Sequence, residues 1–194
     1  MRVILRLRIK GAEDLPNNGP FVITPNHASY WDSLAVCAAL GLRRMRQTYW
    51  VGWAKLLFRG PIRRLLSRAA HILPIDPDRG PARGLAFGAA AKQREKILVW
   101  FPEGGLSPTG ELGRFLPGIG SLVANTTVKI VPVLIEGTFE AMPCGLRWPK
   151  LRQITITFGR PRTADDLESH GEGSSTNQRI ANGLQGAVAS LRNQ

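Results

Sequence analysis

The chain has 194 residues, 43% of them hydrophobic, which is enough for one well-buried core and too little for two, so we expect a single domain over residues 1–194. The formal net charge of +12 favours an anionic partner: nucleic acid, an anionic membrane or a phosphorylated substrate. Cys37 and Cys144 have neither metal-site nor disulfide spacing, which indicates a reduced, cytoplasmic setting. We expect no signal peptide and, because no uncharged apolar run approaches about 18 residues, no membrane span; binding to a membrane surface stays open.

The first half of the chain predicts a strand, a turn and a helix around one histidine. Strands are predicted over 3–10 and 21–25, and the apolar segment that follows the second strand predicts a helix. His27 then lies just before the helix and Asp32 in its first turn, so that the two side chains can meet. A carboxylate on one ring nitrogen fixes the tautomer and leaves the other nitrogen free as a general base. The alternative for Asp32 is a capping role at the helix start.

Residues 43–68 form a basic and aromatic stretch that no acidic residue interrupts. Trp50, Trp53 and three apolar residues after them have helical spacing, which predicts a helix with one aromatic face; a Gly-Pro pair ends it, and a second basic helix follows. One interpretation is a core-facing stripe with a solvated basic face. The other is a pair of interfacial helices whose Trp50, Trp53, Arg63 and Arg64 contact a membrane. Both can hold together.

The second half alternates buried strands with helices. Short apolar runs predict strands over 71–75, 97–101, 129–135 and 154–159, and helices are predicted over 82–95, 116–126 and 178–192. Pro132 indicates an edge or irregular position within its strand. Continuous apolar runs are typical of strands that helices cover on both faces. The fold class is therefore α/β, with a single mixed, mostly parallel sheet flanked by helices, and the loops after the strands are expected to gather into one site.

Four segments, taken in order, match the motifs of one enzyme family. They are N-H-A-S-Y-W-D at 26–32, I-L-P-I-D at 72–76, F-P-E-G-G-L-S at 101–107 and V-P-V-L-I-E-G at 131–137. This set resembles the phospholipid and glycerol-phosphate acyltransferase family, in its 1-acylglycerol-3-phosphate acyltransferase-like branch, whose first motif is N-H-x4-D and whose third block is F-P-E-G-x-x-S. The motif-bearing core extends over about residues 10–162, and a C-terminal loop and helix occupy 163–194.

The resemblance implies a glycerol-3-phosphate acyltransferase-like fold and an O-acyltransferase of phospholipid biosynthesis. An acyl group would pass from acyl-CoA or acyl-ACP, as co-substrate and with no other cofactor, to the hydroxyl of a lysophospholipid or related lyso-lipid. His27 would be the general base, Asp32 would orient it, and backbone amides near the turn would hold the oxyanion. A carboxylate beside strand-end glycines can bind hydroxyls and anions; the resemblance assigns the acceptor to Glu103 and Gly104, with Gly105 and Ser107 beside them.

Two arginines that the family associates with the acceptor phosphate are missing. Pro77 stands where the family has Arg after the second block, and Gly105-Leu106 replaces Thr-Arg in the third. Arg79 or Arg83 is expected to substitute for the first arginine, and nothing adjacent replaces the second. A lysophospholipid with another headgroup, or a lyso-aminolipid, is therefore a credible acceptor.

Other function classes have weaker support. A serine hydrolase or thioesterase could use Ser29 or Ser121, but the sequence has no Gly-x-Ser-x-Gly elbow. A non-catalytic basic module is compatible with the charge, yet aromatic residues are 7% and no nucleic-acid motif occurs, so no nucleic-acid partner is expected. His71 and His170 have no metal-ligand spacing relative to His27, and no metal is expected. The expected partners are the two substrates, acyl carrier protein and an anionic membrane, with the protein peripheral on its inner, cytoplasmic face.

Overall fold

The computed structural model describes residues 6–53, 60–75, 96–142 and 150–193. Its centre is a seven-stranded sheet of order β1-β7-β6-β2-β5-β3-β4. The neighbouring strands run parallel except β6 and β7, which are antiparallel. The prediction of a mixed, mostly parallel sheet is confirmed. The strands are β1 (Leu7–Lys10), β2 (Phe21–Pro25), β3 (Thr48–Trp53), β4 (Ile72–Ile75), β5 (Ile97–Val99), β6 (Lys129–Glu136) and β7 (Ile154–Phe158).

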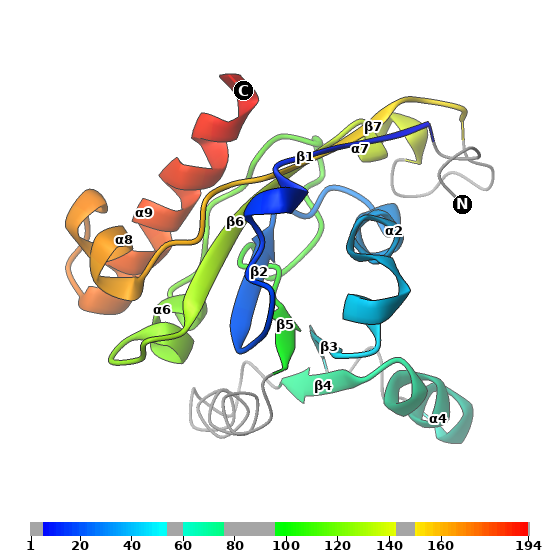
Figure 1. The fold of residues 1–194 in the computed structure, drawn as a ribbon, viewed down its shortest axis with the longest axis horizontal. Helices are drawn as coiled ribbons and strands as arrows, with labels where there is room; N and C mark the ends of the chain where they lie inside the picture. The colour runs from blue at the N-terminus through cyan, green and yellow to red at the C-terminus, as the bar shows by residue number, and fades with distance from the viewer. Residues whose placement is uncertain (1–5, 54–59, 76–95, 143–149, 194) are drawn as a thin grey trace.

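Helices cover both faces of the sheet (Figure 1). One face packs against α2 (Trp31–Met45), and the other against α6 (Gly118–Val123), α8 (Ala164–His170) and α9 (Thr176–Ala189). The short α4 (Pro61–Ala69) lies beside β4, the edge strand, and α7 (Thr138–Ala141) follows β6. Two short 3-10 helices, η1 (Ala12–Asp14) and η3 (Ser190–Asn193), complete the described elements. No described helix has the length and apolar character needed to cross a membrane.

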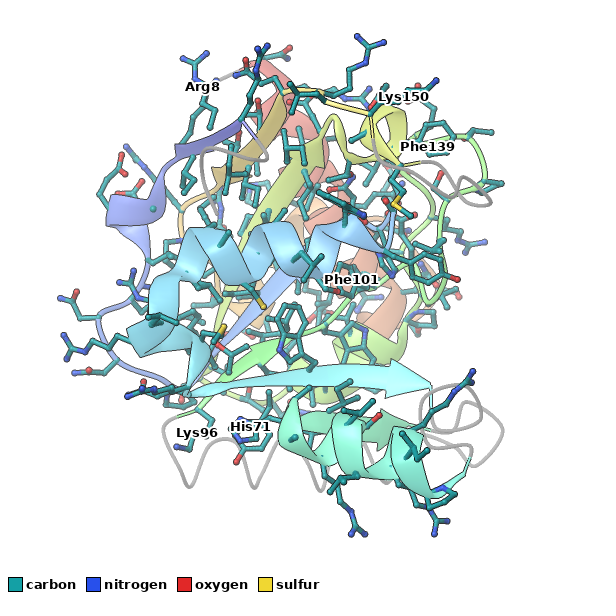
Figure 2. The ribbon with its side chains drawn as sticks, turned by 90° about the vertical axis from the view of Figure 1, so that its right-hand side faces the viewer. Arg8, His71, Lys96, Phe101, Phe139 and Lys150 are labelled. Carbon is teal, nitrogen blue, oxygen red and sulfur yellow. The ribbon has the colours of Figure 1, made fainter. Side chains whose placement is uncertain are left out.

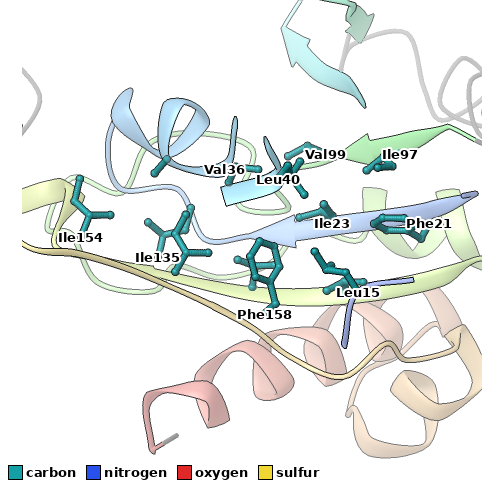
Figure 3. Packing of buried hydrophobic residues seen from close by; sticks show 14 of the residues in the cluster. Leu15, Phe21, Ile23, Val36, Leu40, Ile97, Val99, Ile135, Ile154 and Phe158 are labelled. Atoms are coloured by element: carbon teal, nitrogen blue, oxygen red, sulfur yellow. The ribbon is translucent and has the colours of Figure 1, made fainter. Parts of the chain in front are cut away.

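The core consists of two apolar clusters, one on each face of the sheet. Because side chains alternate along a strand, Phe21 and Ile23 of β2 join the cluster on the α2 side, while Val22 joins the cluster under α6 and α9 (Figure 3). β5 and β6 alternate in the same way. These strands are apolar on both faces because both are buried, which explains the continuous apolar runs of the sequence.

Pro132 lies in an interior strand, at an irregular point of the sheet. β6 pairs with both β2 and β7, so an edge position is wrong. The regular register with β7 begins at Val133, and the next pairing, Ile130 with Arg162, is shifted by one residue, as in a β-bulge. A proline lacks an N–H to donate and is tolerated at such a place. The alternative of an irregular position is confirmed.

The predicted helix through Trp50 and Trp53 is wrong. Residues Thr48–Trp53 form β3, which pairs with β4 and β5, and residues 54–59 lie outside the described part. The run Thr-Tyr-Trp-Val is rich in β-branched and aromatic residues, whose preference for strands outweighed the helical spacing. The basic helix after the Gly-Pro pair is confirmed as α4. α8 was not predicted, and the predicted helix over 82–95 lies outside the described residues.

Candidate active site

His27 and Asp32 meet at the carboxyl end of β2. The strand ends at Pro25 and α2 begins at Trp31, so the intervening turn presents the histidine at the sheet edge. The His27 Nδ1 lies 2.9 Å from the Asp32 Oδ2, which confirms that the two side chains meet. The Asp32 side chain is 0% exposed and that of His27 18% exposed, so the acid is buried behind a ring that reaches the surface.

One oxygen of Asp32 organises the whole turn. Its Oδ2 accepts hydrogen bonds from the backbone N–H groups of Ala28, at 2.7 Å, and Ser29, at 2.8 Å, as well as the contact with His27. Asp32 lies in the first turn of α2, but its side chain accepts from amides that precede the helix and makes no N-cap hydrogen bond, so the contacts match the expected orienting position and not the capping alternative. An ionised carboxylate only accepts hydrogen bonds, so this arrangement assigns the ring hydrogen to Nδ1 and leaves the Nε2 lone pair free in the neutral imidazole. The other oxygen, Oδ1, is buried and accepts no hydrogen bond from the described residues.

An aromatic ring fixes the plane of the imidazole. Phe101, just beyond β5, stacks on His27 with the ring centroids 3.9 Å apart and an interplanar angle of 22°. Figure 2 places Phe101 at the N-terminal end of α2. β2 and β5 are parallel neighbours, so their carboxyl ends bring the two rings to one edge. Sequence reasoning gave Phe101 no role, although its place in the third motif was the available signal.

Asn26 joins the histidine turn to the neighbouring strand β6 by two hydrogen bonds. Its side-chain amide donates to the carbonyl of Ile135, at 3.0 Å, and its side-chain oxygen accepts from the Ile135 N–H, at 2.7 Å. The β2–β6 pairing ends at Pro25 and Val133, so the Asn26 side chain replaces the peptide group that the next residue of β2 would have supplied. This buried residue belongs to the site's scaffold. Its role was missed because it depends on a strand more than 100 positions away.

Glu103 ties this turn to the loop that follows β5. The His27 N–H donates to its Oε1 at 2.9 Å, and the Gly113 N–H donates to its Oε2 at 3.2 Å. Burial raises the pKa of the Glu103 carboxyl, and these two hydrogen bonds offset part of that rise. The carboxylate is thus a positioned bridge between two backbone segments. Each oxygen keeps a free lone pair, so the expected contact with the acceptor stays a prediction.

The third motif continues as a loop packed against the histidine turn. The Ser107 N–H donates to the His27 carbonyl at 2.7 Å, and Ser107 is buried. Gly104 has a φ of 74°, a left-handed conformation that favours glycine, and a Cβ there would also displace the Leu116 side chain, whose methyl carbon would lie 2.6 Å away. Gly105 beside it is exposed. Gly104, Gly105 and Ser107 are thus brought together with Glu103 and His27.

A shallow groove of ≈ 310 Å³ opens along this loop. Its walls come from the first and the last residues of the loop. They include Glu103, Gly105, Leu106, Ser107, Leu112 and Arg114. Arg114 is exposed and makes no hydrogen bond or ion pair within the described part of the chain, whereas Glu111 is paired with Arg192 at 3.2 Å. The groove therefore contains one arginine without an ion-pair partner among the described residues, together with the Glu103 carboxylate. The sequence analysis did not identify Arg114 as a groove residue, because it joins Leu106 in the groove lining only when the loop folds back so that Gly113 bonds Glu103.

Three backbone amides of the histidine turn, those of residues 27–29, already donate hydrogen bonds. Those of Ala28 and Ser29 donate to Asp32, and that of His27 donates to Glu103. These three amides are therefore not free to bind an oxyanion, and any amide that does so must come from a neighbouring residue. The amides of Gly105 and Leu106, which line the groove, donate no hydrogen bond among the described residues.

The remaining predicted residues lie elsewhere. Arg79 falls outside the described residues, as do Arg83 and the side chain of Trp53. Trp50 is partly buried and packs against the core cluster on the α2 side. Arg63 and Arg64 are exposed on α4. Within the described ranges, no group of three or more His, Cys, Asp or Glu could hold a metal ion.

The fold and the site define a class: an α/β protein with a His–Asp pair and a glycine-flanked carboxylate at the carboxyl edge of a parallel sheet. A family model described as Acyltransferase matches residues 6–136, and the chain belongs to this acyltransferase family. It is 27% identical over 158 residues to a 1-acyl-sn-glycerol-3-phosphate acyltransferase of Pseudomonas aeruginosa, covering 75% of this chain and 52% of that protein. A chloroplastic 1-acyl-sn-glycerol-3-phosphate acyltransferase of Arabidopsis thaliana is 30% identical over 149 residues, which are 72% of this chain and 38% of that one.

The structural comparison agrees on the fold. The crystal structure of the 1-acyl-sn-glycerophosphate (LPA) acyltransferase PlsC from Thermotoga maritima matches 96% of this chain and 71% of its own, with a TM-score of 0.66 and 16% sequence identity. The chain spans about half the length, or less, of the curated relatives it matches.

Proposed function

We propose that the protein is an O-acyltransferase that moves a fatty acyl group from an acyl thioester, acyl-CoA or acyl-ACP, to the hydroxyl of a lysophospholipid or related lyso-lipid. The observation that carries this proposal is the His27 Nδ1 to Asp32 Oδ2 contact of 2.9 Å, with the ring partly exposed beside the groove-lining Glu103. Membership of the acyltransferase family supports it.

The chemistry needs one base and no covalent enzyme intermediate. His27 Nε2 takes the proton from the acceptor hydroxyl while that oxygen attacks the thioester carbonyl. The tetrahedral intermediate then expels the thiolate, the C–S bond breaks, and the proton on His27 passes to the leaving sulfur. Asp32, buried against Nδ1, stabilises the imidazolium between these two steps. General-base assistance of this kind contributes about 10²–10⁴ in rate.

The developing oxyanion needs donors that are not already engaged. Several amides of groove-lining residues meet this condition among the described residues, and those of Gly105 and Leu106 are the ones that directly follow Glu103 and Gly104 in the chain. We assign the oxyanion to them in place of the occupied amides at 27–29.

The groove favours an acceptor with an anionic headgroup. Arg114 supplies a cation that has no partner among the residues that the structure describes, and Leu106 of the same groove lining supplies an apolar contact. Glu103 lies in the same wall, close to the base through the His27 N–H, where its remaining lone pairs can accept from an acceptor hydroxyl.

The test is a transfer assay with a labelled acyl thioester, given as CoA and as carrier-protein ester, against a panel of lysolipids. His27→Ala should lower the rate of lipid acylation by about 10²–10⁴. His170→Ala, which removes an exposed histidine on α8, is the matched control and should leave the rate unchanged. Full turnover by His27→Ala would overturn the base role. Consumption of thioester at the same rate without any acceptor would make the protein a hydrolase.

The acceptor assignment has its own test. Arg114→Gln should raise the KM for a lysolipid bearing a phosphate monoester by about tenfold, because a charge-assisted hydrogen bond is lost, and should leave the KM for a neutral monoacylglycerol unchanged. Leu106→Arg, which introduces the family's usual residue, should improve use of the phosphate-monoester acceptor. Equal effects on charged and neutral acceptors would show that the headgroup is not held in this groove.

A further inference from the structure

The helix α4 (Pro61–Ala69) exposes its apolar side chains. Ile62 is 73% exposed, Leu65 is 70% exposed and Leu66 is 62% exposed, while Ser67 is the buried residue of the helix. A surface helix of a globular protein normally turns its apolar stripe toward the core. In α4 the stripe points away from the core. These three side chains therefore have no protein cover within the described residues.

The same surface is strongly basic. Arg64 and Arg68 lie one helical turn apart, and neither guanidinium forms a hydrogen bond or ion pair with a described residue. No acidic residue occurs anywhere from position 43 to position 75. Two like charges at this spacing destabilise a helix unless an anion lies between them. Together with Pro61 and Leu65 they line a shallow depression of ≈ 450 Å³.

A second element on the same side of the molecule also exposes apolar and basic side chains. In Figure 2, α4 lies on the face turned to the viewer, below α2. Near its end α2 carries Leu42, which is 73% exposed, and the exposed Arg43 and Arg44. Apolar tips with basic flanks thus recur on two elements of one face. Such a combination suits the boundary between anionic headgroups and acyl chains, because the basic side chains can bind the headgroups while the apolar side chains enter the acyl region.

We propose that α4 docks this protein on an anionic phospholipid bilayer, with Ile62, Leu65 and Leu66 in the acyl boundary and Arg64 and Arg68 at the lipid phosphates. The inner leaflet carries the negative potential that favours such a helix. This inference adds a membrane partner to the proposed function. It rests on the proposed function only in assuming that the membrane supplies the lysolipid acceptor. β3, which precedes α4, runs parallel to β5, so α4 follows a strand that ends at the edge of the sheet where His27 lies.

The experiment is flotation of the full chain with phosphatidylcholine vesicles that contain or lack phosphatidylglycerol. The wild-type chain should bind the anionic vesicles and lose most binding at high salt. The triple variant Ile62→Ser, Leu65→Ser, Leu66→Ser should weaken binding by about tenfold or more, and Arg64→Gln with Arg68→Gln by roughly fivefold per arginine. All these side chains are exposed, so circular dichroism and thermal melting should match the wild type.

Matched surface variants serve as controls. Leu151→Ser removes an exposed leucine, and Arg160→Gln an exposed arginine, from the other end of the sheet order; neither should change vesicle binding. Unchanged binding by both α4 variants would overturn the proposal. So would a loss of turnover confined to the carrier-protein donor with vesicle binding intact, because the surface would then bind an acidic protein. Vesicle binding is measured without catalysis, so failure of the acyltransferase proposal would be seen separately, in the transfer assay.

Discussion

The two halves of the sheet use polar groups in opposite ways. At the carboxyl ends of β2 and β5, three polar side chains are buried or half-buried and hydrogen-bonded to the backbone: Asn26 to Ile135, Asp32 to the turn and Glu103 to two amides. At the β3–β4 edge, α4 leaves arginines and apolar tips exposed together. The paired half holds a reacting geometry, and preorganised polar groups are what catalysis requires. The exposed apolar side chains of α4 are the ones for which we propose a membrane partner, and side chains this exposed add little to folding.

The sharpest way to break the paired half is Asp32→Asn. The amide nitrogen cannot accept from Nδ1–H, so the ring loses its orientation and the imidazolium its counter-charge. We expect the transferase rate to fall by about 10³–10⁴, as such changes do when an acid orients a catalytic histidine. Single-turnover measurements with acyl-CoA check this. A loss no greater than that of Asp166→Asn, a half-buried aspartate on α8, would contradict it.

Truncating one leucine in each half tests the difference in folding. Leu98 of β5 is 2% exposed, and Leu98→Ala should lower the free energy of unfolding by roughly 2–5 kcal/mol. Leu65 of α4 is 70% exposed, and Leu65→Ala should change it by no more than about 0.5 kcal/mol. Urea denaturation measures both. Similar losses would mean that α4 is covered by the protein itself in solution.

Asn26→Ala should destabilise the paired half without removing any apolar contact. The change leaves the N–H and C=O groups of Ile135 buried without their partner, which costs roughly 2–4 kcal/mol. For a chain of this size the melting temperature should fall by about 2–4 °C for each kcal/mol. Asn177→Ala, which removes one side-chain hydrogen bond at the start of α9, is the control and should cost less than about 1 kcal/mol. Equal losses would show that Asn26 does not carry the turn.

The smallest expected effect concerns an ion pair far from both regions. The Arg179 guanidinium, with help from the Thr176 hydroxyl, lowers the pKa of the Glu168 carboxyl. A lowered pKa in the folded state means that the carboxylate stabilises the fold above its unfolded pKa, and that this contribution disappears as pH falls through the folded pKa. Glu168→Gln should therefore melt slightly below the wild type at neutral pH, and the two should converge in acid. A difference that persists in acid would point to lost packing; Glu172→Gln, an exposed neighbour, is the control.

The sequence predicted what depends on local pattern. Apolar runs located β2, β5 and β6, and the five-residue spacing of His27 and Asp32 was enough to predict their contact, because the strand, turn and helix lie within one continuous segment. The stretch at 48–53 was misread because the helical spacing of its tryptophans competed with strand preference, and pairing with β4 and β5 decided the outcome. α8 was missed, although Thr163, whose side chain accepts from the Asp166 N–H, gave a capping signal.

The rest of the site depends on contacts between distant segments. The Glu103 bridge joins residues 76 positions apart, and the Asn26 anchor joins residues 109 apart. Arg114 becomes a groove residue only because the loop after β5 folds back to the Gly113 amide. The periodicity of a sequence does not predict hydrogen bonds between segments this far apart. The motifs identified residues of the site. The structure was needed to show that Asn26 and Glu103 position the histidine turn through hydrogen bonds.

The loop between Gly104 and Gly113 is fixed by hydrogen bonds at each end: the Ser107 N–H donates to the His27 carbonyl, and the Gly113 N–H donates to the Glu103 carboxylate. Its tip can therefore change in sequence while the imidazole and its acid keep their places. Evolution can alter the preferred lipid by drift in these few positions, without rebuilding the catalytic pair. A graft that exchanges this tip for one of equal length from a relative should carry the donor's headgroup preference into a chain whose turnover chemistry is untouched.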